Sequence, residues 1–148
     1  MKRVITACLA ASLVATPVAD AFARCVNAKE RTAMRVRVMQ TELMVAALSC
    51  RAVPGRDFTG HYNAFIKSQG ERLVGHGQVL QGYFKSRYGA DFRRQLDAFI
   101  TALGNDASRR SMNSATFCDE SVALFQEVTN LDRNSLESWS DRRAAPQA

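Results

Sequence analysis

Along most of the chain, apolar residues recur at the three- and four-residue steps of amphipathic helices. The clearest stripe predicts a first helix over residues 27–50, with Asn27 capping its start. The dipeptide Pro54-Gly55 then breaks the pattern. The apolar face of this helix is formed by Val36, Met39, Leu43, Ala46 or Ala47, and Cys50.

Three further amphipathic segments follow. The second starts at Thr59 as N-cap, is interrupted or kinked at Gly70, and stops at Gly89. The third begins at Asp91 and fades around residues 109–111, and the fourth begins near residues 113–114. Their apolar residues are Tyr62, Phe65, Ile66, Leu73, Leu80, Phe84 and Tyr88, then Phe92, Leu96, Phe99 and Leu103, then Phe117, Leu124, Phe125, Val128 and Leu131.

This pattern predicts an all-α fold, a small up-down bundle of about four helices in one domain over residues 24–134. Strand-like alternation and hairpin signals are absent from the sequence. Residues 135–148 are polar, and we expect them to form a flexible C-terminal tail. Trp139 is expected to pin a short turn of this tail back on the domain.

The N-terminal residues indicate export. Lys2 and Arg3 precede an uncharged stretch over residues 4–15, and the run Ala21-Phe22-Ala23 supplies the small residues that signal peptidase needs. We expect residues 1–23 to be a cleaved signal peptide and the mature chain to be exported from the cytoplasm. The apolar stretch is too short for a transmembrane anchor, which needs about 20 residues, and no other segment approaches that length.

Cleavage would remove Cys8 and leave Cys25, Cys50 and Cys118 in an oxidising compartment. Cys25 and Cys50 bracket the first helix and lie up to about 35 Å apart, too far for a disulfide. In an up-down bundle the first helix ends where the fourth begins, so we expect a Cys50–Cys118 disulfide, with two buried thiols as the alternative. Cys25 would then be a free thiol, an intermolecular link or an alternative partner for Cys118.

The charge is unevenly distributed. Residues 24–94 contain 13 Lys or Arg and 5 acidic residues, a balance of +8, whereas residues 95–148 contain 5 and 8, a balance of −3. The basic half predicts contact with an anionic envelope component or another periplasmic protein, and a merely solvated basic surface is the alternative. Nucleic acid is not an expected partner in this compartment. The candidate contact patch comprises Lys85, Arg87, Tyr88, Arg93 and Arg94.

The catalytic motifs that we tested are absent from the sequence. It contains no Cys-x-x-Cys, no His-Glu-x-x-His, no phosphate-binding loop and no Gly-x-Ser-x-Gly. His61 and His76 would lie about 22 Å apart on a continuous helix, so they could share a metal only if the chain folded back near Gly70. We expect no catalytic residue, no metal and no cofactor.

Several strings resemble a family of small exported proteins from alphaproteobacteria. They are LMVAALSC at residues 43–50, YNAF at 62–65, His76-Gly77 leading to Tyr83-Phe84, Arg87-Tyr88-Gly89, and Phe117-Cys118. The resemblance covers about residues 31–125. It implies a Gram-negative periplasmic location, and it assigns no activity and no functional residue.

These observations favour a non-enzymatic periplasmic binding protein whose basic helical surface contacts an envelope component. One alternative is a small thiol-dependent redox protein or enzyme that uses Cys25 or a histidine. The other alternative is a periplasmic helical chaperone or stress protein.

Overall fold

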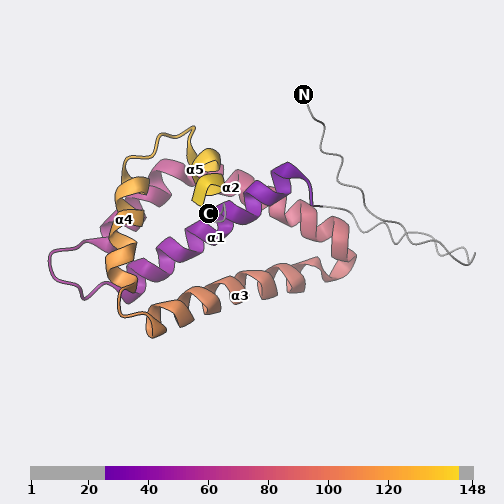
Figure 1. Ribbon diagram of the computed structural model, residues 1–148. Coiled ribbons are helices and arrows are strands. Elements are labelled where there is room, and N and C mark those ends of the chain that lie inside the picture. Colours follow the sequence, from indigo (N-terminus) through magenta and orange to yellow (C-terminus); the bar gives the residue numbers. More distant parts are fainter. Residues whose placement is uncertain (1–25, 144–148) are drawn as a thin grey trace, which may run out of the picture.

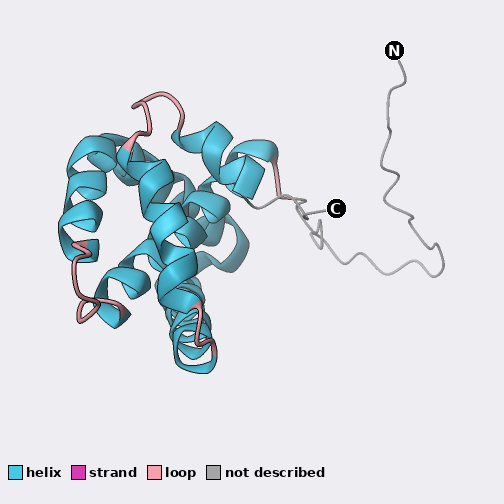
Figure 2. Cartoon of the chain, turned by 60° about the vertical axis from the view of Figure 1, so that its left-hand side comes forward, coloured by secondary structure: helices cyan, strands magenta, loops and turns pink. Residues whose placement is uncertain are grey.

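The computed structural model describes residues 26–143, and this part of the chain is all-α (Figures 1 and 2). The predicted helical bundle is confirmed, and no strand occurs within residues 26–143. The expected signal peptide lies outside the described residues. The elements are α1 (Ala28–Ser49), α2 (Phe58–Tyr88), the short 3-10 helix η1 (Gly89–Asp91), α3 (Phe92–Asn113), α4 (Phe117–Thr129) and α5 (Leu136–Arg143).

α1 lies at the centre of the bundle and contacts each of the other four α-helices. α2 runs back antiparallel to α1, and after the turn at η1 α3 returns alongside α1 (Figure 1). These three helices alternate in direction, as an up-down bundle requires. The shorter α4 crosses the end of α1 at a steep angle, and α5 packs on α1 (Figure 1).

The predicted apolar stripe of α1 forms the centre of the core. Val36 and Leu43 are almost completely buried, and Ala46, Ala47 and Cys50 continue the stripe toward the end of the helix. Such burial of apolar area is the main favourable term in folding. The other helices contribute Phe58, Phe65 and Leu73 from α2, Phe125 and Val128 from α4, and Leu136 and Trp139 from α5.

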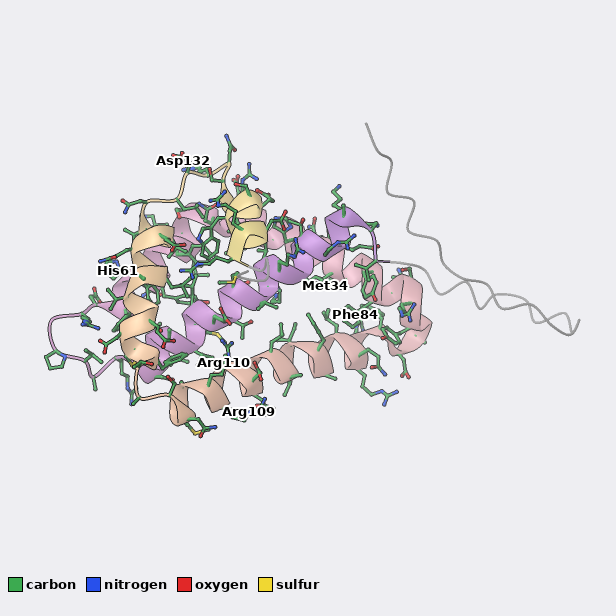
Figure 3. All side chains as sticks on the ribbon, viewed as in Figure 1. Met34, His61, Phe84, Arg109, Arg110 and Asp132 are labelled. Carbon is green, nitrogen blue, oxygen red and sulfur yellow. A yellow bond between two sulfur atoms is a disulfide. The ribbon has the colours of Figure 1, made fainter. Side chains whose placement is uncertain are left out.

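α3 is the least buried of the three long helices. Ala107 is its one fully buried side chain, and the predicted stripe residue Phe99 is half-buried. The Phe99 ring packs against Phe84 of α2 with 5.5 Å between centroids, and Figure 3 shows Phe84 close to the turn that joins the two helices. These contacts hold the α2–α3 hairpin together while leaving part of the α1-facing side of α3 uncovered.

Side-chain caps and one glycine define the helix ends. The Asn27 side chain accepts a hydrogen bond from the Glu30 N–H at 2.9 Å, and the Glu30 carboxylate accepts one from the Asn27 N–H at 3.0 Å. This capping box confirms Asn27 as the N-cap of α1. Asp57, not Thr59, caps α2, because its carboxylate accepts from the Gly60 N–H at 2.8 Å. Gly89 ends α2 as predicted.

Of the two alternatives predicted at Gly70, the interruption is wrong, because α2 continues through Gly70 to Tyr88. A glycine inside a helix costs about 1 kcal/mol relative to alanine. Phe65 and Leu73 are buried on either side of Gly70, and burying each such side chain contributes about 1.5–3 kcal/mol, enough to offset that cost. α4 begins later than predicted, at Phe117, because α3 extends to Asn113.

The prediction of a flexible tail from residue 135 is wrong for residues 136–143, which form α5. Leu136 and Trp139 are 1% and 3% exposed. The Trp139 Nε1–H donates to the Glu127 carboxylate at 2.8 Å, so the interpretation of Trp139 as a pin is confirmed. Two buried apolar side chains and one charge-assisted hydrogen bond therefore attach a largely polar segment to the bundle. Residues 144–148 lie outside the described part.

A disulfide joins Cys50, which follows α1, to Cys118 in the first turn of α4, as predicted. The two Cα atoms are 5.6 Å apart, a separation that a disulfide spans. The bond closes a loop of 68 residues and fixes the crossing of α4 at the end of α1. Cys25 lies outside the described residues.

Candidate functional site

The fold gathers the residues of the predicted contact patch at one turn. Lys85, Arg87 and Tyr88 belong to the last turn of α2, and Arg93 and Arg94 belong to the first turn of α3. All five side chains are exposed. We call these five residues the basic tip, because they lie at the end of the molecule where η1 reverses the chain (Figure 1).

The basic tip has an excess of positive charge. Arg94 is neutralised by Asp91, whose pKa is lowered first by the hydrogen bond from the Arg94 guanidinium and then by its charge. Arg93 lies over the Phe92 ring, 5.5 Å from its centroid, a cation–π contact that leaves its charge in place. Lys85 and Arg87 form no ion pair with any residue in 26–143. Three of the four cations of the tip are thus without an acidic partner in the described chain.

An aromatic side chain accompanies these charges. Tyr88 is 40% exposed, and its ring stacks on the buried Phe84 with 5.7 Å between centroids. Phe84 in turn contacts Phe99 of α3. The aromatic side chain of the tip is therefore supported by the buried Phe84 ring, which packs in turn on the half-buried Phe99.

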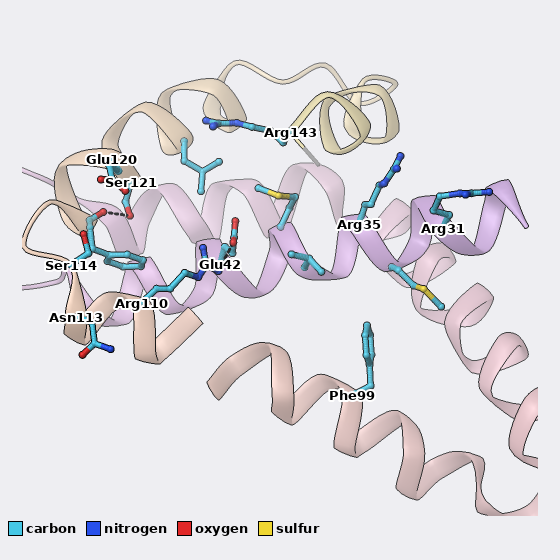
Figure 4. A pocket seen from close by; sticks show the side chains of 15 residues that line it. Arg31, Arg35, Glu42, Phe99, Arg110, Asn113, Ser114, Glu120, Ser121 and Arg143 are labelled. Carbon is cyan, nitrogen blue, oxygen red and sulfur yellow. Dashed lines mark hydrogen bonds and ion pairs between the residues drawn. The ribbon is translucent and has the colours of Figure 1, made fainter. Parts of the chain in front are cut away.

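A second feature, which the sequence did not predict, is an open cleft of about 650 Å³ between α1, α3, α4 and the end of α5 (Figure 4). Phe99 points from α3 across the cleft toward α1. The apolar lining comprises Met34, Val38 and Met39 from α1, Phe99 from α3, and Phe117 and Leu124 from α4. The polar lining comprises Arg31, Arg35, Glu42, Arg110, Asn113, Ser114, Glu120, Ser121 and Arg143.

The arginines on the rim of the cleft differ in their partners. Arg110 projects from α3 toward α1 (Figure 3) and pairs there with Glu42, so this pair bridges the cleft (Figure 4). Arg31 donates a hydrogen bond to the Val26 carbonyl at 3.4 Å and pairs with no acidic side chain within the described residues. The remaining rim arginines are paired, Arg35 with Asp141 at 2.9 Å and Arg143 with Glu127 at 2.8 Å.

Sequence reasoning missed the cleft because it followed one stripe of α1, the stripe that enters the core. Met34 and Val38 form a second apolar pair, one helical turn apart, beside that stripe. Arg31 and Arg35 have the same four-residue spacing, and each lies three positions before one member of this pair, on the same side of the helix. A wider apolar face on α1, one that includes Met34 and Val38 beside the core stripe, would have predicted a second apolar surface that the other helices only partly cover.

The two histidines lie on the unbroken α2, about 22 Å apart along the helix axis. His76 Nε2 is 3.1 Å from a Glu137 carboxylate oxygen, and His61 Nδ1 is 3.4 Å from Thr129 Oγ1. Each imidazole therefore contacts a different helix. Within residues 26–143, no three His, Cys, Asp or Glu side chains are arranged to hold a metal ion.

No protein-family model, no curated protein and no solved structure matches this chain. The resemblance to exported alphaproteobacterial proteins stays a prediction. None of the helices in the described chain is both long and apolar enough to cross a membrane. The candidate function consequently rests on the geometry of the basic tip and of the cleft.

Proposed function

We propose that this protein is a non-enzymatic binding protein of the Gram-negative periplasm and that its basic tip docks on an anionic phospholipid surface. The observation that carries the proposal is the concentration of four exposed cationic side chains at one turn. Asp91 is the single acidic residue in the intervening segment, 85–94. Because this turn is at one end of the molecule, it can approach a flat surface without obstruction from the rest of the bundle.

The expected binding is weak and depends on salt. Each Lys or Arg near an anionic membrane contributes about 1 kcal/mol, so three cations without acidic partners supply about 3 kcal/mol. Screening over about 8 Å at physiological ionic strength reduces the attraction between exposed charges. Tyr88 adds an aromatic ring with a polar end, the kind of side chain that is enriched at membrane interfaces.

The periplasmic part of the proposal is supported by the signal-like N-terminal sequence and by the disulfide, which persists in oxidising compartments. Both cysteines within residues 26–143 are joined to each other. A thiol-dependent redox function would consequently depend on Cys25, which is outside the described chain. No observation on the described residues favours a chaperone.

Co-sedimentation with vesicles tests the proposal. The native chain is expected to bind vesicles that contain phosphatidylglycerol and not vesicles of phosphatidylcholine alone, and the binding should fall steeply with salt. The triple variant Lys85→Gln/Arg87→Gln/Arg93→Gln should bind about 100-fold more weakly, because three charges of about 1 kcal/mol each are removed.

The matched control removes the same charge elsewhere. Arg51, Lys67 and Arg133 are exposed and form no ion pair within the described residues, and their triple Gln variant should keep binding within a fewfold of native. Equal losses in both triple variants, or no native binding to anionic vesicles at low salt, would overturn the proposal. Binding to lipopolysaccharide micelles but not to phosphatidylglycerol vesicles would show that the anionic partner is lipopolysaccharide and not a phospholipid.

A further inference from the structure

We infer that the cleft between α1, α3 and α4 binds a single amphipathic monoanion, a long-chain carboxylate, with its hydrocarbon chain on the apolar lining and its head group at Arg31. This inference is independent of the proposed docking, because no residue of the basic tip lines the cleft. It assigns a class of ligand to the cleft between these helices.

The apolar part of the ligand is indicated by the lining. Met34 and Val38 of α1 and Phe99 of α3 are each half-buried. They therefore remain partly in contact with the water that fills the cleft, whose volume is about 650 Å³. This volume falls within the range of about 300–1,000 Å³ that is typical of small-molecule sites. A hydrocarbon chain would remove these side chains from water, at a gain of about 25 cal/mol per Å² of apolar surface.

The charge and the orientation of the ligand are indicated by the rim. Arg31 carries a positive charge with no acidic partner in residues 26–143, whereas Arg110 is already paired with Glu42. Glu120 lies at the opposite end of the cleft from Arg31 (Figure 4), where it accepts a hydrogen bond from Thr116 at 2.6 Å. An anionic head group is therefore attracted to the Arg31 end and repelled from the Glu120 end.

Isothermal titration with saturated carboxylates, below their micelle concentrations, tests the inference. Dodecanoate is expected to bind with one-to-one stoichiometry and about tenfold more tightly than decanoate, because two more methylenes are buried. Dodecanol, which has the same chain without the charge, should bind about tenfold more weakly than dodecanoate.

Two single variants separate the contributions of charge and chain. Arg31→Gln should weaken dodecanoate about tenfold and leave dodecanol unchanged, because it removes the partner of the head group alone. Met34→Gln should weaken the binding of both ligands equally, since it places a polar side chain in the apolar lining of the cleft. Arg51→Gln, at an exposed site outside the cleft, is the matched control and should change neither affinity.

Three outcomes would overturn the inference. The first is no heat of dodecanoate binding with the native chain at millimolar ligand. The second is the same affinity in the native, Arg31→Gln and Met34→Gln proteins, which would place the ligand elsewhere. The third is a dimer mass by light scattering without ligand, combined with no carboxylate binding, which would assign the cleft to a second copy of the chain. The triple variant of the basic tip should bind dodecanoate as the native chain does, so the two proposals can fail separately.

Discussion

At the scale of single residues, Glu137 is the side chain that ties α5 to α2. Its carboxylate accepts from the Arg72 guanidinium at 2.6 Å and lies 3.1 Å from His76 Nε2. Burial opposes the ionisation of Glu137, but hydrogen bonds from its own backbone, from His76 and from Arg72 outweigh burial and lower its pKa below the ordinary 4.5. The lowered pKa means that the ionised carboxylate stabilises the folded chain.

This shift makes stability depend on pH in a defined direction. Because the pKa of Glu137 is lower in the folded than in the unfolded chain, its contribution is complete above about pH 4.5 and is lost as the pH falls through the folded value. We expect Glu137→Gln to lower the free energy of unfolding by about 1 kcal/mol at pH 7, with the difference from native shrinking below pH 4.5. Urea unfolding at pH 7, 5 and 3 measures both effects.

The control is a carboxylate in an exposed ion pair. Asp119 pairs with Arg56 at 2.9 Å, with 73% of its side chain exposed, and exposed pairs contribute little to stability. Asp119→Asn should therefore change the free energy of unfolding by less than about 0.5 kcal/mol at every pH. A deficit in Glu137→Gln that stays constant from pH 7 to pH 3 would contradict the assignment of the stabilisation to the ionised carboxylate.

At the scale of elements, hydrophobic periodicity predicts a helix correctly where the helix buries a long apolar stripe, and it fails where the buried stripe is short. α1 was predicted nearly to the residue, because its stripe extends over the whole helix and Asn27 marks its start. α5 has eight residues, and two of its three buried residues are apolar, Leu136 and Trp139. A helix this short is not stable alone. It exists because of tertiary contacts such as that of Trp139 with Glu127, which local patterns do not contain.

The turn between α2 and α3 offers an element-scale prediction in which one substitution has opposite effects at two glycines. Gly89 has φ 55° and ψ −125°, a conformation that side chains with a Cβ adopt at a cost of about 1–3 kcal/mol. Gly89→Ala should therefore lower the free energy of unfolding by about 1–3 kcal/mol. Gly82 lies inside α2 with open space around its Cβ position, so Gly82→Ala should raise it by about 0.5–1 kcal/mol.

Thermal unfolding of the two alanine variants measures the difference directly. The variants share the same composition and lie seven positions apart, so each serves as the control for the other. A melting temperature for Gly89→Ala at or above that of Gly82→Ala would show that the η1 turn does not need the positive φ.

At the scale of the whole molecule, the basic tip and the disulfide could be predicted, and the cleft could not. Lys85 and Arg94 are near neighbours in sequence, so any hairpin of two helices brings them to one turn. The Cys50–Cys118 pairing followed from helix length and alternation of direction. The cleft depends on how α3 packs against the other helices, and tertiary contacts such as that of Phe84 with Phe99 cannot be read from the helical period of the sequence.

The disulfide is also the largest single contribution to stability that we assign. It closes a loop of 68 residues, and the chain-entropy model gives about 4 kcal/mol for a loop of that length. We expect Cys50→Ala/Cys118→Ala to lose about 4 kcal/mol in the free energy of unfolding, a large share of the 5–15 kcal/mol that is typical of a domain. Guanidinium unfolding under oxidising conditions measures the loss.

Cys25→Ala is the matched control for this double variant, because it removes a cysteine while Cys50 and Cys118 stay joined. It should retain the protection that the closed loop gives against guanidinium, whereas a reducing agent should bring the native chain down to the level of the double variant. Peptide mapping that found Cys25 joined to Cys118 would contradict the pairing. A loss below about 1 kcal/mol in the double variant would contradict the loop-closure argument instead, since it would mean that the packing of α4 on α1 alone holds the two helices together.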